Sequence, residues 1–423
     1  MGILRFIRPR IAILKEVAEE ENEKNRNVGE LCSGVQFMKE NKSFSTYTLI
    51  SGGSQTDRFW PEYNRIADAL RHKYSVAALI CPEEDGSVFT MEECGDSDGQ
   101  LQPVCFQDRT QFGFDPILSE DHRMLATVLG QVSASVSGAN GAKSNYWRFV
   151  LDFLTEAHGH ADLAHLLDLD HQKMMDAIND LYGSGKLSAQ AYNGFCSRYD
   201  QELEAQCAAA NDLCTELAPM RTALRKKNVS MDDLHKRQGL LILDSIPKGS
   251  AACINLIMLL VKNASLHGRM VLMTDNVGCA EDDLQRRTIL ESADAKLPMI
   301  LGGDLPTLMG SLFDTLVAHK CHKFVFSHTS GISAEQWSKH FGTYSKKIVD
   351  YTHTDNQSNT AVVEKNLGDD VTVRTDENAR KITIDDLQKL EAGQAYVQIP
   401  GQARIHHLKC PRITLSRMKE KLC

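Results

Sequence analysis

The order of the apolar segments is the feature that most limits the fold of this chain. Two strand-like runs, Thr46–Ile50 and Val76–Ile80, enclose a segment in which Trp60, Tyr63 and Ile66 recur at helical spacing. Strand, helix and strand in this order predict a βαβ unit, which requires parallel strands and a right-handed crossover. The same alternation resumes in the second half of the chain. We therefore predict an α/β fold with a doubly wound, mainly parallel sheet.

The middle of the chain has a different pattern. Between residues 145 and 235 the strand-like runs stop, and apolar residues recur at steps of three and four, which predicts an all-helical inserted domain. The length of 423 residues suits two or three domains. In chain order we predict an N-terminal leader and linker at 1–28, a discontinuous α/β domain at 29–144 and 236–410, the helical insertion at 145–235, and a basic tail at 411–423.

Two segments near the C-terminus have less regular patterns. His353–Glu377 is strongly polar, which predicts a loop or a twisted hairpin. Ala395–Ile399 alternates like a strand, and we predict that it lies at the edge of a sheet. The tail after residue 410 has apolar residues among basic ones, which is typical of a partner-binding helix or a frayed terminus.

Composition excludes several classes of protein. A net charge of −9 makes the whole chain a poor electrostatic match for nucleic acid, so any DNA contact must be a local patch. Twelve cysteines without a single C-x-x-C pair indicate neither a disulfide framework nor a zinc ribbon, and they favour a reducing compartment. No stretch approaches the ~18–20 apolar residues of a membrane span. These observations predict a soluble, cytoplasmic protein.

The turn after the first strand is placed where α/β proteins bind phosphate. It reads Ser51-Gly52-Gly53-Ser54-Gln55-Thr56-Asp57-Arg58. In the phosphate loop G-x-x-x-x-G-K-[ST], lysine neutralises phosphate oxygens and the hydroxyl binds magnesium. Here Asp57 and Arg58 take those two positions. Moving the alignment by one residue brings Arg58 to the lysine position, but Phe59 then replaces the hydroxyl.

The exchange of lysine for aspartate has a large electrostatic effect. Two unit charges at ~4 Å and an effective dielectric constant of ~20 interact with about 4 kcal/mol, so Asp57 would turn attraction for phosphate into repulsion. The alternative is that this Gly/Ser turn binds nothing at all.

Several segments resemble, in order, parts of the type IV secretion coupling proteins, the TraG/TraD/DotL-like ATPases of conjugation. They are Ala78–Glu84, Phe114–Pro116, Asn145–Trp147, Leu243–Pro247, Leu272–Gly278, Gly302–Pro306, and a closing part that runs from Lys323 to Val397. The resemblance implies a RecA/FtsK-like P-loop NTPase fold, in which the α/β domain binds nucleotide and the helical domain meets the transferred substrate.

The departures from that family lie at catalytic positions. Asp275 matches the Walker B aspartate, but the following glutamate is replaced by Asn276, whose amide cannot accept a proton from the attacking water. The sensor glutamine of G-Q-D-L-P is replaced by Gly303, which precedes Asp304. Asp244 also follows a strand and is the alternative Walker B residue, but Ser245 comes after it. With the altered phosphate loop, these changes indicate a degenerate member of the family.

Other polar clusters have structural interpretations that compete with functional ones. His158, His160, His165 and His171 lie near acidic residues, but their spacing matches no metal motif, and we predict no metal site. A basic patch at the end of the insertion suits either a solvated helix end or a contact with DNA phosphates or a partner. It consists of Arg221, Arg225, Lys226, Lys227, Lys236 and Arg237.

Three hypotheses follow. The first is a catalytically degenerate pseudo-ATPase that acts as an adaptor or assembly component of a conjugative or type IV secretion element. Its partners would be an active coupling ATPase, other secretion subunits, or a DNA or relaxase-like substrate, in an oligomer. The second is a functional NTPase that binds ATP and Mg²⁺ with an atypical loop. The third is a DNA- or protein-binding module centred on the helical insertion.

Overall fold

The computed structural model describes residues 27–40, 47–81, 90–94, 112–237, 239–244, 250–277, 282–354 and 368–422. The chain forms two compact units. The smaller one combines residues 1–41 with 322–411, and the larger one combines 42–321 with 412–423. The predicted leader up to residue 26, the motif residues Pro82–Glu84 and Ser245–Pro247, and Gly278 lie outside the described residues. The predicted domain limits stay predictions.

The larger unit is built on a mainly parallel sheet. Its strands follow the order β2-β9-β8-β3-β7-β4, and every neighbouring pair is parallel except β4 with β7. All residues of β2, β3, β8 and β9 are buried, as expected for central strands covered on both faces. The bounds are β2 Tyr47–Ser51, β3 Ser75–Ile80, β4 Thr90–Cys94, β7 Leu240–Asp244, β8 Met270–Asp275 and β9 Met299–Gly303.

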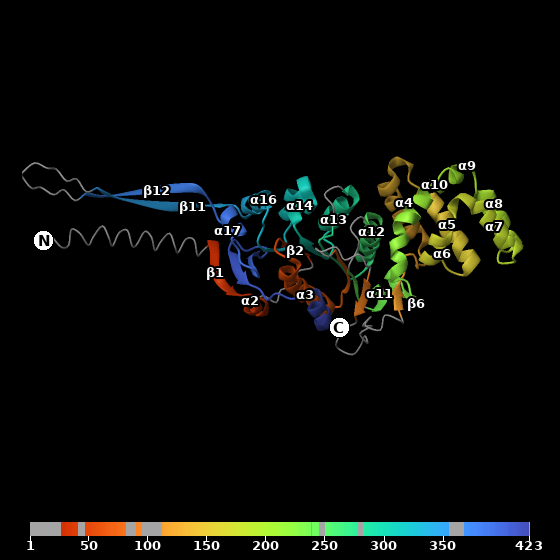
Figure 1. The fold of residues 1–423 in the computed structure, drawn as a ribbon, viewed down its shortest axis with the longest axis horizontal. Coiled ribbons are helices and arrows are strands. Elements are labelled where there is room, and N and C mark those ends of the chain that lie inside the picture. The colour runs from red at the N-terminus through yellow and green to blue at the C-terminus, as the bar shows by residue number, and fades with distance from the viewer. Residues whose placement is uncertain are drawn as a thin grey trace, which may run out of the picture. The chain divides into compact units, whose positions relative to one another are not determined.

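Helices cover this sheet on both faces, so the predicted doubly wound α/β class is confirmed. Figure 1 shows α3 on one side of the strands and α12, α13 and α14 on the other. The bounds are α3 Gln55–Arg71, α12 Ala251–His267, α13 Asp283–Asp294, α14 Leu305–Met309, α15 Phe313–Ala318 and α18 Leu415–Leu422. In α3 the predicted apolar positions Trp60 and Ile66 are buried.

A helical region is inserted between β4 and β7 (Figure 1). Two short parallel strands, β5 and β6, pair where the chain enters and leaves it. Its helices begin with α4, before the predicted start at residue 145, and α4 packs against α5, α10 and α12. The bounds are β5 Phe112–Phe114, α4 His122–Ser137, α5 Ser144–His158, α6 Leu163–Asp168, α7 Met174–Gly183, α8 Ala189–Arg198, α9 Gln201–Glu204, α10 Cys207–Leu217, β6 Lys227–Val229 and α11 Met231–Arg237.

The core of the helical region contains a buried polar chain. The Tyr146 hydroxyl lies 2.8 Å from Nδ1 of His171, and Nε2 of that ring lies 3.3 Å from Sγ of Cys214. Burial lowers the pKa of His171 to about 4, so the ring is neutral at pH 7. The other predicted histidines lie elsewhere: His160 and His165 both contact Oδ2 of Asp162. Within the described ranges no three His, Cys, Asp or Glu side chains are placed to hold a metal ion.

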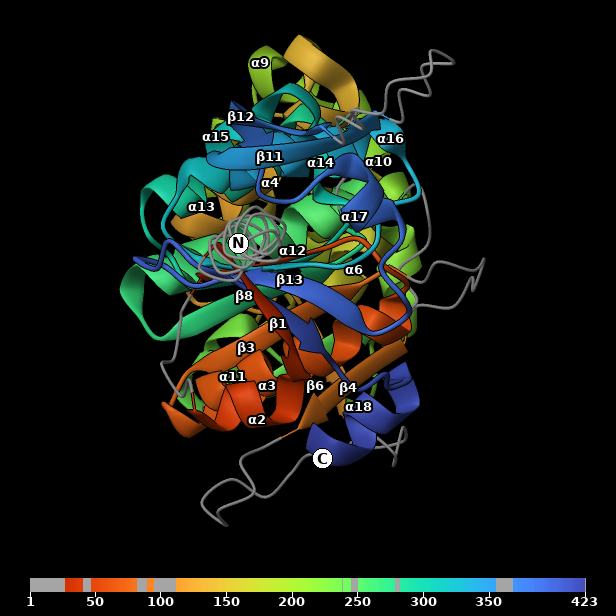
Figure 2. The same ribbon diagram turned by 90° about the vertical axis from the view of Figure 1, so that its left-hand side faces the viewer.

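The smaller unit contains a four-stranded sheet. The order is β1-β14-β13-β10, with β1 parallel to β14 and the other two pairs antiparallel. Figure 2 shows the red β1 running along the blue C-terminal strands. The bounds are β1 Val28–Ser33, α2 Gly34–Glu40, β10 His322–Val325, α16 Gly331–Phe341, β11 Thr343–Thr354, β12 Gly368–Arg380, α17 Ile384–Gln388, β13 Gln394–Gln398 and β14 Ile405–Lys409.

One strand prediction was wrong in this unit. The segment predicted as an edge strand forms β13, which lies between β10 and β14 and pairs with both. The reason is that β14 contains two adjacent histidines, His406 and His407, which conceal its strand pattern. The segment predicted as a loop or twisted hairpin includes the ends of β11 and β12, which pair as an antiparallel hairpin.

No described helix of either unit combines the length and the apolar character that crossing a bilayer requires.

The neutral His171 predicts an acid-dependent loss of stability. The pKa of this ring in the folded protein is about 4, below its ordinary value of 6.5, so the unfolded chain binds a proton that the folded chain does not. The contribution is fully present above pH ~6.5 and is lost as the pH falls to about 4, which amounts to about 3 kcal/mol. Urea unfolding followed by circular dichroism at several pH values measures this effect. Between neutral and acid pH, the free energy of unfolding should fall less for His171→Asn than for the wild type.

His160→Asn, at an exposed ring, is the matched control. An equal fall in the wild type and in both variants would contradict the neutral state of the His171 ring.

Candidate functional site

The candidate site lies at the carboxyl ends of β2, β9, β8 and β3, where parallel sheets bind their ligands. The first strand ends at Ser51 and α3 begins at Gln55, so only three residues connect them. In a phosphate loop a glycine-rich turn leads into the N-terminus of a helix, whose first turn carries the lysine and the hydroxyl. Here the third and fourth residues of α3 are Asp57 and Arg58, so this first turn carries a carboxylate and a guanidinium instead.

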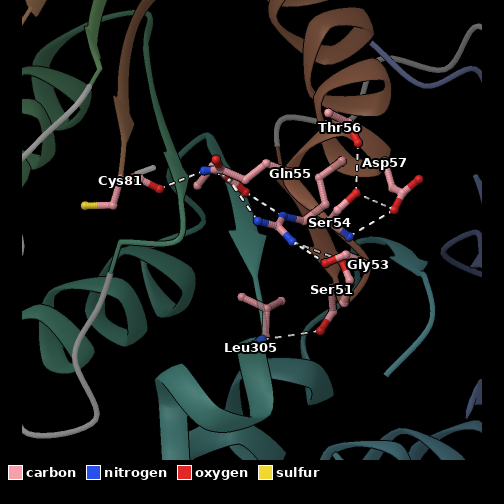
Figure 3. Close-up of polar contacts among 11 residues, drawn as sticks. Ser51, Gly53, Ser54, Gln55, Thr56, Asp57, Cys81 and Leu305 are labelled. Carbon is pink, nitrogen blue, oxygen red and sulfur yellow. Dashed lines mark hydrogen bonds and ion pairs between the residues drawn. The ribbon is translucent and has the colours of Figure 1, made fainter. Parts of the chain in front are cut away.

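The connection is held tightly to the neighbouring strand. Gly52 and Gly53 have φ angles of 78° and 62°, a left-handed conformation that favours glycine. The Gly52 amide donates to the carbonyl oxygen of Gly303 at 3.0 Å. The Leu305 amide donates to Oγ of Ser51 at 3.3 Å, as Figure 3 shows. The backbone amides of Gly52 and Leu305 are thus bound within the protein.

The first turn of α3 is closed by its own side chains. Oδ2 of Asp57 accepts hydrogen bonds from the amide of Ser54 at 2.9 Å and from its hydroxyl at 2.7 Å, which forms a capping box (Figure 3). The carboxylate also balances the partial positive charge of the helix N-terminus. The predicted repulsive residue therefore has a structural role: it occupies the end of the helix to which a phosphate would bind.

The Arg58 side chain lies between Asp275 and the connection that joins β2 to α3. Its guanidinium Nε lies 2.6 Å from Oδ1 of Asp275, and its Nη2 lies 3.3 Å from Oδ2 of the same carboxylate. Its Nη1 donates to the carbonyl oxygens of Gly53 at 2.8 Å and Gly52 at 3.2 Å. The side chains of Arg58 and Asp275 are 2% and 0% exposed, so this ion pair is shielded from water. Charge-assisted, two-pronged contacts of this kind are among the stronger interactions in proteins.

Gln55 holds the other side of the Asp275 carboxylate. Its Nε2 donates to Oδ2 of Asp275 at 2.6 Å and to the carbonyl oxygen of Cys81, at the end of β3, at 2.7 Å (Figure 3). Both carboxylate oxygens are therefore bound by donors from α3. The structure places Asp275 at this turn, whereas Asp244 ends β7, which lies beyond β9, β8 and β3 in the sheet.

Asn276 and Gly303, two further predicted site positions, have left-handed or otherwise unusual backbone conformations. Asn276 has a φ of 58°, and its amide donates to the carbonyl oxygen of Gly302 at 3.0 Å. Gly303 has a φ of 131°, and a Cβ added there would lie 2.7 Å from the Leu308 side chain. The following Asp304 precedes α14, and its Oδ2 accepts a hydrogen bond from Thr307. A glutamine at position 303 would be strained in this conformation.

The predicted basic patch does not join this site. It lies at the end of the helical region, where Arg221 pairs with Asp168 and Arg225 donates to the carbonyl oxygens of Thr222 and Leu224. The backbone of Arg237 ends α11, and Lys236 is exposed one residue before it. Lys226 is exposed and Lys227 begins β6.

Arg412 belongs to the site, but sequence reasoning did not identify it. Arg412 reaches the first turn of α3 from the C-terminal tail: its Nε lies 2.7 Å from Oδ1 of Asp57, and its Nη2 lies 2.9 Å from Oγ1 of Thr56. The only signal in the sequence is the basic character of the tail, which identifies no partner.

The comparisons with known proteins add a distant likeness. No family model and no curated protein sequence matches this chain. Among solved structures, it matches the unbound bacterial conjugative coupling protein TrwB with a TM-score of 0.46 and 12% identity, over 92% of this chain and 95% of that one. The TrwB complex with sulphate gives 0.48 and 11%, over 90% and 92%, and the complex with ADP and Mg²⁺ gives 0.42 and 12%, over 91% and 93%. These values are too low to transfer the ligands or partners of TrwB to this chain.

The buried ion pair predicts that substitutions of Arg58 and Asp275 have non-additive effects on the free energy of unfolding. Arg58→Met should lower the free energy of unfolding by about 3–5 kcal/mol, because it leaves the Asp275 carboxylate buried without its cation. The double variant Arg58→Met/Asp275→Asn should recover much of that loss, because no buried charge remains. Urea denaturation of the wild type, both single variants and the double variant measures the coupling. Additive losses would show that the two side chains act independently.

Proposed function

We propose that this chain is an NTPase-fold protein whose phosphate site is filled by its own arginine. In this proposal it is an adaptor or assembly component of a conjugative or type IV secretion element, and it is not a motor. The observation that carries the proposal is the inverted polarity of the connection between β2 and α3. A phosphate loop directs amides at an anion, whereas here the carbonyl oxygens of Gly52 and Gly53 accept from the Arg58 guanidinium.

In this proposal the Walker B-like carboxylate is not available to magnesium. The Walker B-like Asp275 is bound on Oδ1 by Arg58 and on Oδ2 by Gln55 and Arg58. A divalent cation would have to displace the guanidinium, which supplies positive charge and hydrogen bonds together. Loss of the Arg58 contacts to Gly52 and Gly53 would add to that cost.

Two groups that hydrolysis uses in the resembled family are replaced in this chain. The amide of Asn276 cannot act as a general base, and Gly303 has no side chain to sense a γ-phosphate. Phosphoryl transfer depends on positioning and charge stabilisation, so the combined changes remove several parts of one mechanism. Loss of hydrolysis explains all of them together.

The proposed role in a secretion system is supported by seven segments that resemble, in order, parts of the coupling-protein family. In that setting the helical region would contact secretion subunits, an active coupling ATPase, or a DNA or relaxase-like substrate, in the cytoplasm. The basic patch supports a DNA contact only weakly, because Arg221 and Arg225 already have partners within the chain.

Calorimetric titration with ATP and Mg²⁺ tests the proposal. We expect no heat of binding up to millimolar nucleotide for the wild-type chain, because Arg58 occupies the site. Asp275→Asn is the matched variant, since it removes the Walker B-like carboxylate but keeps its shape. Magnesium-dependent binding that is present in the wild type and lost in Asp275→Asn would overturn the pseudo-ATPase proposal and favour a functional NTPase.

A further inference from the structure

The C-terminal tail of the larger unit binds at the first turn of α3. Its residue Arg412 meets three side-chain oxygens there: Oδ1 of Asp57 at 2.7 Å, Oγ1 of Thr56 at 2.9 Å and Oγ of Ser54 at 3.3 Å. The next residue, Ile413, donates its amide to the carbonyl oxygen of Thr56 at 3.1 Å. Side-chain and main-chain contacts together fix the register of the tail on α3.

The tail then forms a short helix that packs on the same element. Helix α18 lies against α3 (Figure 1), and its Met418 is fully buried. Lys421 lies over the Tyr63 ring, with Nζ 5.6 Å from the ring centre. Leu415 and Met418 are three residues apart, so these two apolar side chains share one face of the helix.

The oxygens on α3 suit an arginine. Asp57 supplies a carboxylate that is only 6% exposed, and the two hydroxyls extend the acceptor surface beside it. A planar guanidinium with several donors matches such a set better than a single ammonium does. Arg412 itself stays 50% exposed, so the tail is held by a contact that solvent and a competing peptide can reach.

We propose that the first turn of α3 is a binding site for an arginine-bearing peptide that continues into a short amphipathic helix. The chain's own residues Arg412–Leu422 are its resident ligand, and a partner protein with a segment of the same chemistry binds α3 by displacing them. This inference rests on the proposed function, because a helix N-terminus that held nucleotide would have no place for the peptide.

Peptide binding to the full-length chain tests the inference. The probe is a fluorescein-labelled peptide with the sequence of Pro411–Leu422, followed by fluorescence anisotropy without nucleotide. The chain variant Arg412→Glu repels its own tail from Asp57 but leaves the capping box of α3 unchanged. We expect this variant to bind the probe at least about tenfold more tightly than the wild type, in which the tail competes.

Two controls make the result specific. Arg417→Glu makes the same charge change within α18 and should bind the probe like the wild type. A probe that carries Arg412→Glu should not bind the Arg412→Glu chain. Failure of the unaltered probe to bind that chain, or equal binding by both probes, would overturn the inference.

Hydrogen exchange gives a second measurement that needs no added peptide. The amides of residues 413–422 should exchange about tenfold faster in Arg412→Glu than in the wild type, and Arg417→Glu should leave the Ile413 amide protected. Equal exchange at that amide in the wild type and Arg412→Glu would overturn the inference. Neither experiment contains nucleotide, so nucleotide binding in the separate titration would refute the proposed function without altering these results.

Discussion

The ion pair between Arg58 and Asp275 is the interaction on which the candidate site depends. It joins the first turn of α3 to the end of β8, and the remaining guanidinium donor holds the Gly52–Gly53 connection. Each partner would be expensive to bury alone, so the sequence must keep both or neither. The glycines, with their left-handed φ angles, let the carbonyl groups turn inward toward the arginine.

The sequence predicted the fold class more completely than it predicted the site. Regular alternation of apolar runs defined β2, β3, β8 and β9, because central parallel strands must be apolar on both faces. The Asp275 position was also predicted correctly as the end of a strand. The partner of that carboxylate could not be predicted, because Arg58 reaches it across 217 positions of sequence. Local pattern contains no information about such a contact.

The same limit applies to Arg412 and to β13. Arg412 is 355 residues beyond Asp57 in the sequence, since it belongs to a tail that rejoins the larger unit after the smaller unit is complete. The position of β13 between two strands depended on β14, whose pair of histidines does not resemble a strand. In both cases the missing information was a pairing between distant segments.

The three-residue connection between β2 and α3 has a consequence for how such a protein can change over generations. Point substitutions at Asp57, Arg58, Asn276 or Gly303 leave the length of that connection unchanged. An insertion in the connection would instead separate Arg58 from its carboxylate. The short turn thus couples the length of this loop to the buried ion pair, so a change of length there disturbs the core as well as the surface.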